Sequence, residues 1–495
     1  MTGHGVDARV IRARLKHPVI DADGHTVEYV PALESYIQAE GVTIGLNNSF
    51  AAAIRPLAQA LERNKAAAPH GFEWYRRTPE ERYRRRITRP SWWGVPAENT
   101  LDLATAMFPH LLAQRLESLG IDFAVVYPTM GLGFPHVQTE QVRLAACRAI
   151  NRYHADIFAG HRQRLEPVAV IPMHTPAEAL NELEYAVRTL GYRAILIPSY
   201  VQRPIPAAQQ ESARMAGYAT ALDTYGIDSA YDYDPVWAKC IELGVSVSTH
   251  SPTMGIGTRA SISSYMYNHI GHFAAAGEAL CKSLFFGGVT RRFPRLRVAL
   301  LEGGVAWGAT VYGDIVSRWS KRNRDSVRRY APERIDLDRF TRLFLEHADA
   351  AMRSDLGNEV SFALEQRPQN ENDFVDEWAA SGVNSVQDIH DRFVPNFFFG
   401  CEADDRMVAA SIDPRLFPLS PRFRAFFSSD IGHWDVPDMR GVLPEAWELV
   451  QDGLLDEEGF ADFTFRNAAR FYLESNPHFF DGTALAQEVK GLQAA

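Results

Sequence analysis

The sequence predicts an α/β protein, a closed (β/α)8 barrel of the TIM-barrel type that carries large helical insertions. Two observations predict this fold. Short runs of β-branched and aromatic residues alternate along the 495-residue chain with longer amphipathic segments, which is typical of βα units and a parallel sheet. Eight such runs are present, and eight parallel strands joined by crossovers favour closure into a barrel.

The eight candidate strands are separated by segments that are long enough to form helices. Amphipathic helices are expected, for example, over residues 139–158, 176–190 and 235–244. In chain order, the strands are expected at residues 18–24, 122–128, 165–172, 193–199, 245–250, 296–302, 396–402 and 424–430.

Three stretches, at about 29–100, 200–233 and 320–392, are longer than an ordinary βα connection. The first is rich in Arg and Trp, the second is polar, and the third is charged with a helical pattern. The sequence shows no internal repeat, low-complexity tract or Pro/Gly/Ser linker. We therefore expect one barrel domain over residues 1–495, interrupted by three insertions.

Insertions of this kind in a barrel commonly form a lid or a subunit contact. The first insertion is larger than a lid requires and is rich in aromatic residues, which are typical anchors of protein interfaces. These aromatic residues predict a homodimer or a higher homo-oligomer; they are Trp74, Tyr75, Trp92 and Trp93.

Composition excludes several classes of partner. The 51 Lys and Arg residues are outnumbered by 61 Asp and Glu residues, and no lysine-rich run could follow a phosphate backbone, so nucleic acid is not expected. No apolar stretch approaches the ~18 to 20 residues of a membrane span, and the N-terminus lacks the apolar segment of a signal peptide. The four cysteines are widely spaced and form no C-x-x-C motif. A cytoplasmic protein with free thiols and a small-molecule substrate is expected.

Ionisable residues stand where several predicted strands end, which is the end of a barrel that carries catalytic residues. The first strand offers Asp23 and His25, which alternation in an extended chain places on the same side. The later strands add His250, Glu302 and Asp430, with His433 three residues beyond the last of these. Imidazole and carboxylate groups together suit Zn, Mn, Fe or Ni.

A single His or Asp at a strand end is more often a hydrogen-bonding turn residue than a metal ligand. The occurrence of such residues at several strand ends favours the metal interpretation, because buried acids are costly unless they are paired or bound to metal. Two further acids receive other interpretations. Asp21 lies deeper in the first strand and is expected to support the ligands, and Glu28 is expected to cap the following helix.

Several motifs together resemble a known family. They are VIDADGH, GIDFAVVYP, VSTHSP, GGVTRRFPRLRVALLEGGVAW, FFSSDIGHWD and FRNAARFY. Their order and spacing are similar to the amidohydrolase-related (amidohydrolase 2) family of metal-dependent barrels, the group that includes aminocarboxymuconate-semialdehyde decarboxylase. The resemblance extends over about residues 17–200 and 235–475 and leaves the insertions outside it.

The resemblance implies a ligand set for one divalent ion, Zn in the first place and otherwise Mn, Fe or Ni. Asp23 and His25 would occupy the strand-one positions, where the family usually has H-x-H or E-x-H. His250 and Asp430 would be the other ligands, with Asp430 also taking a proton from metal-bound water, and His433 would lie near the substrate. Glu302 departs from the pattern, because the decarboxylases of the group place a histidine there as acid/base.

That departure favours hydrolysis of a small aromatic or carboxylate-bearing substrate by a metal-activated water, with Glu302 as general acid/base beside Asp430 and His433. The alternative is a non-oxidative decarboxylase, or another C–C lyase or hydratase, in which Glu302, His433 or His272 donates a proton to carbon. A metal-binding barrel without catalytic activity and a structural assembly protein are the interpretations from other classes.

Three further residues are candidates for substrate binding. His272 follows His269 by about one helical turn, and packing or substrate contact is expected for both rather than ligation. Arg89 and Trp93 could belong to a lid over an anionic aromatic substrate, although a Trp-rich segment suits a subunit interface equally well.

Overall fold

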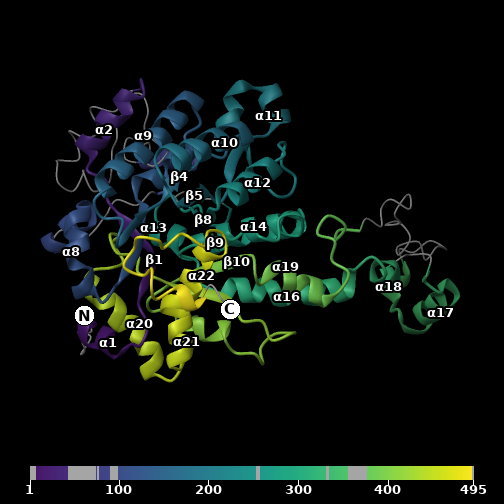
Figure 1. Ribbon diagram of the computed structural model, residues 1–495. Helices are drawn as coiled ribbons and strands as arrows, with labels where there is room; N and C mark the ends of the chain where they lie inside the picture. Colours follow the sequence, from purple (N-terminus) through teal and green to yellow (C-terminus); the bar gives the residue numbers. More distant parts are fainter. Residues whose placement is uncertain are drawn as a thin grey trace.

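The computed structural model describes residues 7–42, 74, 77–89, 99–251, 257–330, 334–354 and 376–492. Parallel strands form a barrel at the centre of the molecule (Figure 1). They are β1 (Ile20–Thr26), β2 (Phe123–Pro128), β3 (Leu165–Pro167), β4 (Ala169–Val170), β5 (Ala194–Pro198), β8 (Ser246–His250), β9 (Val298–Leu300), β10 (Phe397–Glu402) and β11 (Arg424–Ser428). All eight predicted runs therefore contain strands, and the predicted barrel fold is confirmed.

The predicted run 165–172 is divided into β3, which pairs with β2, and β4, which pairs with β5. The two short strands occupy a single strand position in the barrel. Val168, which lies between them, still donates to the carbonyl of Val126 on β2 at 3.2 Å. The ring closes between β11 and β1, where the amide of His25 donates to Ile431 at 2.7 Å and the amide of Asp430 donates to Asp23 at 3.1 Å. The order around the barrel is thus β1, β2, β3/β4, β5, β8, β9, β10 and β11.

Helices surround the strands, as Figure 1 shows. They are α1 (Ala8–Arg14), α2 (Val30–Ala39), α6 (Pro79–Arg85), α7 (Thr100–Met107), α8 (Pro109–Leu119), α9 (Glu140–Phe158), α10 (Pro176–Glu184), α11 (Pro206–Glu211), α12 (Asp234–Leu243), α13 (Tyr265–His269), α14 (His272–Phe286), α15 (Val289–Arg292), α16 (Ala306–Arg322), α17 (Leu337–His347), α18 (Ala350–Ser354), α19 (Val386–Phe393), α20 (Val442–Gln451), α21 (Glu457–Ala461) and α22 (Asn467–Leu473). Proline in the first turn and a left-handed glycine at the end delimit α8 and α12, with φ of 73° at Gly120 and 65° at Gly244.

Alternation along the strands separates two hydrophobic cores. In β5, Ala194 and Leu196 belong to the core inside the barrel, whereas Ile195 and Ile197 pack outward against the helices. The inner core is filled by aromatic rings from the C-terminal segment, among them Phe471, whose centroid lies 5.0 Å from that of Phe398. This packing fills the barrel at the end where the strands begin and leaves polar residues to occupy the opposite end, the mouth.

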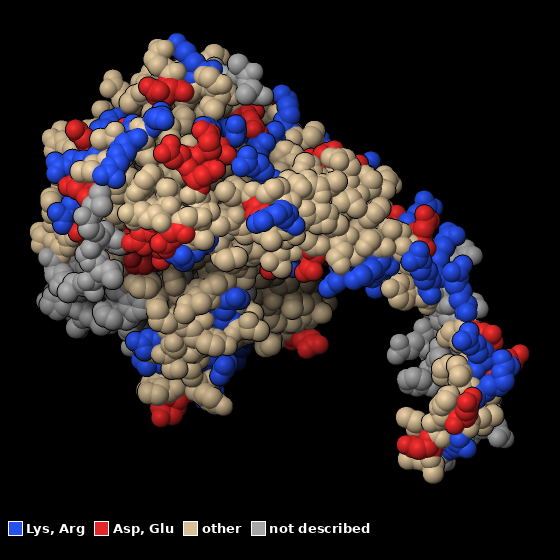
Figure 2. Space-filling model, turned by 90° about the horizontal axis from the view of Figure 1, so that it is seen from below, with Lys and Arg blue, Asp and Glu red and all other residues tan. Residues whose placement is uncertain are grey.

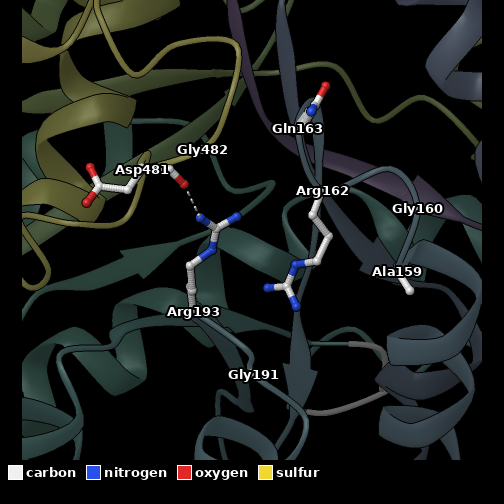
Figure 3. Close-up of a pocket in the computed structure, with 8 residues that line it drawn as sticks. All are labelled: Ala159, Gly160, Arg162, Gln163, Gly191, Arg193, Asp481 and Gly482. Carbon is white, nitrogen blue, oxygen red and sulfur yellow. Dashed lines mark hydrogen bonds between the residues drawn. The ribbon is translucent and has the colours of Figure 1, made fainter.

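A surface pocket of about 520 Å³ lies where β3 and β5 begin, at the end of the barrel opposite the mouth (Figure 3). The carboxylate of Glu166 is fully buried there and pairs with both Arg162 and Arg193. Arg193 also donates to the carbonyls of Phe479 and Asp481, at 2.5 and 3.5 Å. These contacts tie the C-terminal segment to the base of the barrel, so this pocket has a structural explanation.

The insertions contain structure of their own. In the second, β6 (Val201–Pro204) and β7 (Thr220–Asp223) form an antiparallel hairpin that was not predicted. In the third, α17 has no buried residue, and Figures 1 and 2 show this part projecting away from the barrel. In the first, Trp74 donates to the carbonyl of Ile262 at 2.7 Å, so it packs against its own chain. Tyr75, Trp92 and Trp93 lie outside the described residues, and oligomerisation stays a prediction.

The cysteines agree with the sequence-based expectation, because Cys147, Cys240, Cys281 and Cys401 are all buried free thiols. Within the described ranges, no helix is both long and apolar enough to cross a membrane.

Candidate metal centre

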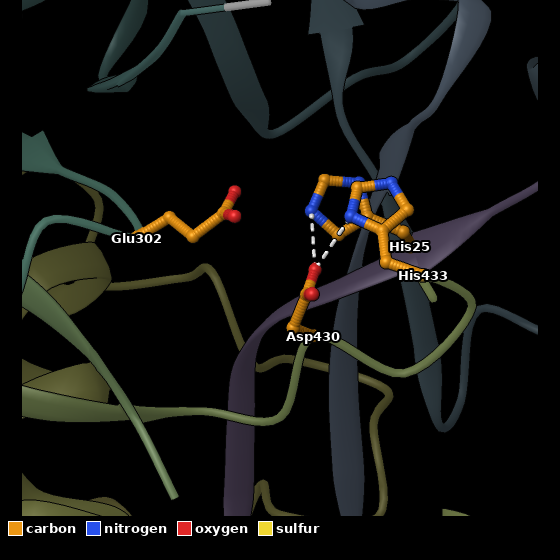
Figure 4. A group of neighbouring side chains, drawn as sticks. All are labelled: His25, Glu302, Asp430 and His433. Atoms are coloured by element: carbon orange, nitrogen blue, oxygen red, sulfur yellow. Dashed lines mark ion pairs between the residues drawn. The ribbon is translucent and has the colours of Figure 1, made fainter. Parts of the chain in front are cut away.

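The strand-end residues that the sequence singled out meet at the mouth of the barrel. Asp23 and His25 come from β1, His250 is the last residue of β8, and Glu302 and Asp430 each stand two residues beyond their strands. All are deeply buried, and the side chain of Glu302 is only 3% exposed. Figure 4 shows Glu302, Asp430 and two histidines pointing toward a common centre.

The backbone at two of these residues is strained. Glu302 and Asp430 have φ values of 57° and 51°, in the left-handed region that residues other than glycine seldom adopt and that costs about 1 kcal/mol or more. Glycine permits each turn to continue: a Cβ on Gly432 would lie 2.5 Å from the carbonyl oxygen of His25. The left-handed backbone conformation at Glu302 and Asp430 is maintained by the surrounding packing, and it directs both carboxyl groups into the mouth.

Distances within the centre are short. His25 Nε2 lies 3.4 Å from Asp23 Oδ1 and 3.5 Å from Asp430 Oδ1. His250 Nε2 lies 2.6 Å from Glu302 Oε2. His433 stacks on His25 with ring centroids 3.8 Å apart, and its Nδ1 is 2.7 Å from Asp430 Oδ1. The possible ligand atoms form two overlapping groups that share His25, each with all its atoms within 4.8 Å of one another; they are Asp23, His25 and His250, and His25, Glu302, Asp430 and His433.

Many polar atoms of the centre are buried and have no hydrogen-bond partner apart from the close contacts with one another and with His433 given above. They are Asp23 Oδ1, both ring nitrogens of His25 and of His250, Glu302 Oε2 and both carboxyl oxygens of Asp430. Unpaired buried polar atoms are rare in native proteins and each one requires an explanation. A cation surrounded by these oxygen and nitrogen atoms would supply the missing partner, so the residues fit a divalent metal ion.

Electrostatics supports the same conclusion. Burial, reinforced by neighbouring carboxyl groups, raises the pKa of Asp23, Glu302 and Asp430 well above its usual value. Burial and the proximity of His433 hold the pKa of His25 and His250 well below its usual value. Negative charge is therefore unfavourable here without a compensating cation, and a bound divalent ion would reverse these preferences.

Two acids near the ligands have supporting roles. Asp21 accepts hydrogen bonds from the amide and hydroxyl of Ser429, at 3.0 and 2.6 Å, and burial raises its pKa to about 6. It joins β1 to β11, as a supporting role requires. The expectation that Glu28 caps the next helix is wrong. Its carboxylate accepts from the amides of Thr129 and Met130, at 3.1 and 2.8 Å, in the turn after β2.

Two residues of the mouth, Glu402 and Asp435, were missed by the sequence analysis, and a third, His269, was expected to pack or contact substrate rather than to belong to a possible metal group. Glu402 ends β10, and burial followed by the proximity of Asp435 raises its pKa to about 8. Asp435 and His269 form a further group with Glu302, again within 4.8 Å of one another. The rule that selected Glu302 would also have found Glu402, because it ends a predicted strand. Asp435 lies in the FFSSDIGHWD motif, and His269 was marked by its spacing of one helical turn from His272.

The predicted substrate-binding residues have different surroundings. His272 is buried at the start of α14, with Nε2 3.1 Å from the hydroxyl of Ser251, next to His250. Arg89 donates to the carbonyl of Ser263 at 3.0 Å and lies over the ring of Trp74. Trp93 lies outside the described residues.

Comparisons with known proteins were made for the whole chain. The family model described as amidohydrolase matches residues 64–343, a range that contains His250 and Glu302. The 2-amino-3-carboxymuconate-6-semialdehyde decarboxylase of Dictyostelium discoideum is 24% identical over 203 residues, which are 41% of this chain and 50% of that protein. This chain thus matches about half the length of that relative.

Two solved structures are similar to this one to different degrees. An amidohydrolase from Mycobacterium avium subsp. paratuberculosis K-10 has a TM-score of 0.50 at 14% identity, over 92% of this chain and 100% of that one. A 2,6-dihydroxybenzoate decarboxylase in complex with 2,6-dihydroxybenzoate has a TM-score of 0.48 at 13% identity, over 92% of this chain and 99% of that one. At such low identity, the first likeness bears on the fold alone.

Proposed function

The chain belongs to the amidohydrolase family, and on that premise we propose that it is a metal-dependent decarboxylase of small aromatic or related unsaturated carboxylates. The single observation that carries the proposal is the position of Glu302, a buried carboxyl group 2.6 Å from His250 that is additional to four sufficient ligands. The partial similarity to a decarboxylase supports this choice over hydrolysis, which the sequence alone favoured.

The ligands in this proposal are Asp23, His25, His250 and Asp430, whose unpaired atoms converge at the mouth. Two imidazoles and two carboxylates suit Zn, Mn, Fe or Ni. When bound, such an ion supplies a Lewis acid that withdraws electrons from a carboxylate and a neighbouring oxygen of the substrate.

Glu302 is the proton donor in the proposed reaction. Loss of carbon dioxide breaks a C–C bond and leaves the bonding pair on carbon, where a proton must take the place of the carboxylate. Burial, followed by the nearby Glu402, Asp435 and Asp23, raises the pKa of Glu302 well above its usual value in the metal-free protein, which is the direction that a proton donor requires. After the transfer, solvent reprotonates Glu302, and one proton is consumed for each carbon dioxide released.

His433 is a positioning residue in this scheme. Its Nδ1 contacts Asp430 at 2.7 Å, its Nε2 lies 3.2 Å from the hydroxyl of Thr129, and its ring stacks on His25. These three contacts orient two of the proposed ligands, which is the usual role of groups around a metal site.

The test uses protein purified without chelator and a panel of hydroxybenzoates labelled with ¹³C in the carboxyl group. We expect metal-dependent release of labelled carbon dioxide, and in D₂O the product should carry one deuterium at the carbon that lost the carboxylate. The proposal is overturned if every acid in the panel and its unsaturated aliphatic counterparts remain intact while amides or esters of the same acids are cleaved.

A hydrolase is the second candidate, and the contact between Asp430 and His433 favours it. A carboxylate 2.7 Å from an imidazole beside metal ligands is an arrangement suited to removing a proton from water. Hydrolysis in H₂¹⁸O would place the label in the product, whereas decarboxylation would not.

A further inference from the structure

The half of the mouth that faces away from Glu302 and Asp430 carries a second group of polar side chains. They come from the ends of β2, β4, β5 and β8, which are neighbours around the barrel, and from the start of α14. They are His136 in the short helix η2 (Phe134–His136), His174, Tyr200, Ser251 and His272. Because the carboxyl ends of parallel strands meet at one edge, this group lies at the same mouth as the ligands.

Contacts connect this group to the metal centre. Ser251 directly follows the ligand His250, and its hydroxyl lies 3.1 Å from His272 Nε2 and donates to the hydroxyl of Tyr200 at 3.2 Å. The ring of Tyr200 meets that of His136 edge-on, with centroids 5.7 Å apart. A continuous polar wall therefore extends from the centre toward β2 and β4.

The wall ends in nitrogen atoms that are buried and unpaired. His136 Nε2 and both ring nitrogens of His174 make no hydrogen bond. Neither histidine belongs to a possible metal group among the described residues. Each neutral imidazole carries one N–H, and a buried donor without a partner is unfavourable, so these positions are suited to a ligand with acceptor atoms.

The charges around the wall favour an anion. Burial lowers the pKa of His174 to about 3, and the nearby Arg143, His136 and Arg203 act in the same direction. Both arginines are fixed by acids, since Arg143 pairs with Glu178 at 2.7 Å and Arg203 pairs with Asp223. Their guanidinium groups are thus held in place, and neutral imidazoles present N–H donors in a positive field.

We propose that His136 and His174, together with Tyr200 and His272, form a subsite for a second carboxylate of the substrate, the one that the reaction leaves in place. This inference rests on the proposed function, because it assumes that the departing carboxylate lies at the metal centre. The substrate class is then an unsaturated or aromatic dicarboxylate rather than a monoacid.

Binding of two small acids to the metal-loaded protein tests the subsite by calorimetry. Isophthalate offers a second carboxylate and benzoate does not. We expect isophthalate to bind about tenfold more tightly or better, the usual worth of a hydrogen bond to a charged group. His174→Phe should remove that advantage while leaving benzoate affinity within about twofold, because the donors are lost and the ring is kept.

Two further variants separate a lost donor from a disturbed fold. His174→Gln keeps a donor and should retain most of the preference for isophthalate. His110→Phe makes the same change as the test variant at an exposed residue of α8 and should alter neither affinity. Each variant is first compared with the parent protein by thermal unfolding.

The outcomes distinguish the subsite from the function on which it rests. Equal affinity for both acids, or an equal loss of both in His174→Phe, overturns the subsite and leaves the decarboxylase proposal standing. Failure of both acids to bind the metal-loaded parent protein overturns the subsite and counts against the proposed function as well.

Discussion

The half of the mouth formed by β9, β10, β11 and β1 differs in charge from the half formed by β2, β4, β5 and β8. The first half gathers carboxyl groups, which are Asp23, Glu302, Glu402, Asp430 and Asp435. The second presents neutral histidines beside arginines that are already paired with acids. Burial raises the pKa of Asp23, Glu302, Glu402 and Asp430, and it lowers the pKa of His136 and His174. The first half therefore favours a cation, and the second suits an anion.

This difference has a consequence for the substrate. The mouth would orient a dicarboxylate. Its reacting carboxylate would lie at the metal and its second carboxylate at the histidines. Orientation of this kind places the proton donor Glu302 on one defined side of the reacting carbon.

The largest effect is expected from loss of a ligand in the acidic half. Asp430→Asn removes one negative ligand and should reduce turnover roughly 10³-fold or more, because several kcal/mol of Lewis-acid stabilisation are lost with the metal. Turnover is measured as the rate of carbon dioxide release, and His110→Phe is the control. Turnover within tenfold of the parent protein would mean that Asp430 is not a ligand.

Glu302→Gln should preserve the shape of the acidic half but remove its proton donor. We expect turnover to fall roughly 10²-fold or more while the metal is retained, in line with the usual worth of a general acid. Glu278→Gln, at a half-exposed residue paired with Lys282, is the matched control. Loss of metal in Glu302→Gln would identify this residue as a ligand instead.

Glu402 should make the metal-free protein sensitive to pH. Its pKa is raised from 4.5 to about 8 by burial and then by Asp435, so its contribution to stability is complete below 4.5 and is lost as pH rises through about 8. The free energy of unfolding should fall by up to about 1.4 kcal/mol per pH unit in this window. Glu402→Gln should flatten the fall in denaturant titrations at pH 5, 7 and 9. If the free energy of unfolding of Glu402→Gln falls with pH as steeply as that of the parent protein, Glu402 is not the group responsible for the pH dependence.

The smallest effect concerns the connection between the halves, where Thr129 after β2 contacts His433. Thr129→Val should lower turnover roughly fivefold, the worth of one hydrogen bond of about 1 kcal/mol, without changing metal content. Thr129→Ser keeps the hydroxyl and should restore the rate. A Ser variant as slow as the Val variant would show that packing, not the hydrogen bond, is responsible.

The sequence predicted the strands well because both barrel cores require strict alternation, as in β5 with Leu196 inside and Ile195 outside. The candidate ligands could be located at the mouth for the same reason, since a polar residue at the end of an apolar run is conspicuous. The hairpin of β6 and β7 was missed because its strands have four residues each and Thr220–Asp223 is mostly exposed. It carries no apolar alternation to recognise.

The remaining errors concern contacts between segments far apart in the chain. Glu28 was assigned to the adjacent helix, but it binds the turn after β2, about a hundred residues later. His269, Glu302 and Asp435 come from distant parts of the chain, yet their possible ligand atoms lie within 4.8 Å of one another. Such proximity depends on loop geometry that local patterns do not encode.

Elemental analysis of protein purified without chelator tests the central claim, that the acidic half of the mouth holds a metal ion. The parent protein and Glu302→Gln should each carry about one divalent ion per chain, because four ligands remain in both, whereas His250→Ala should carry almost none. Folding of each variant is confirmed by thermal unfolding. A folded His250→Ala protein with full metal content, or a parent protein that neither contains nor takes up any divalent ion, would contradict the account.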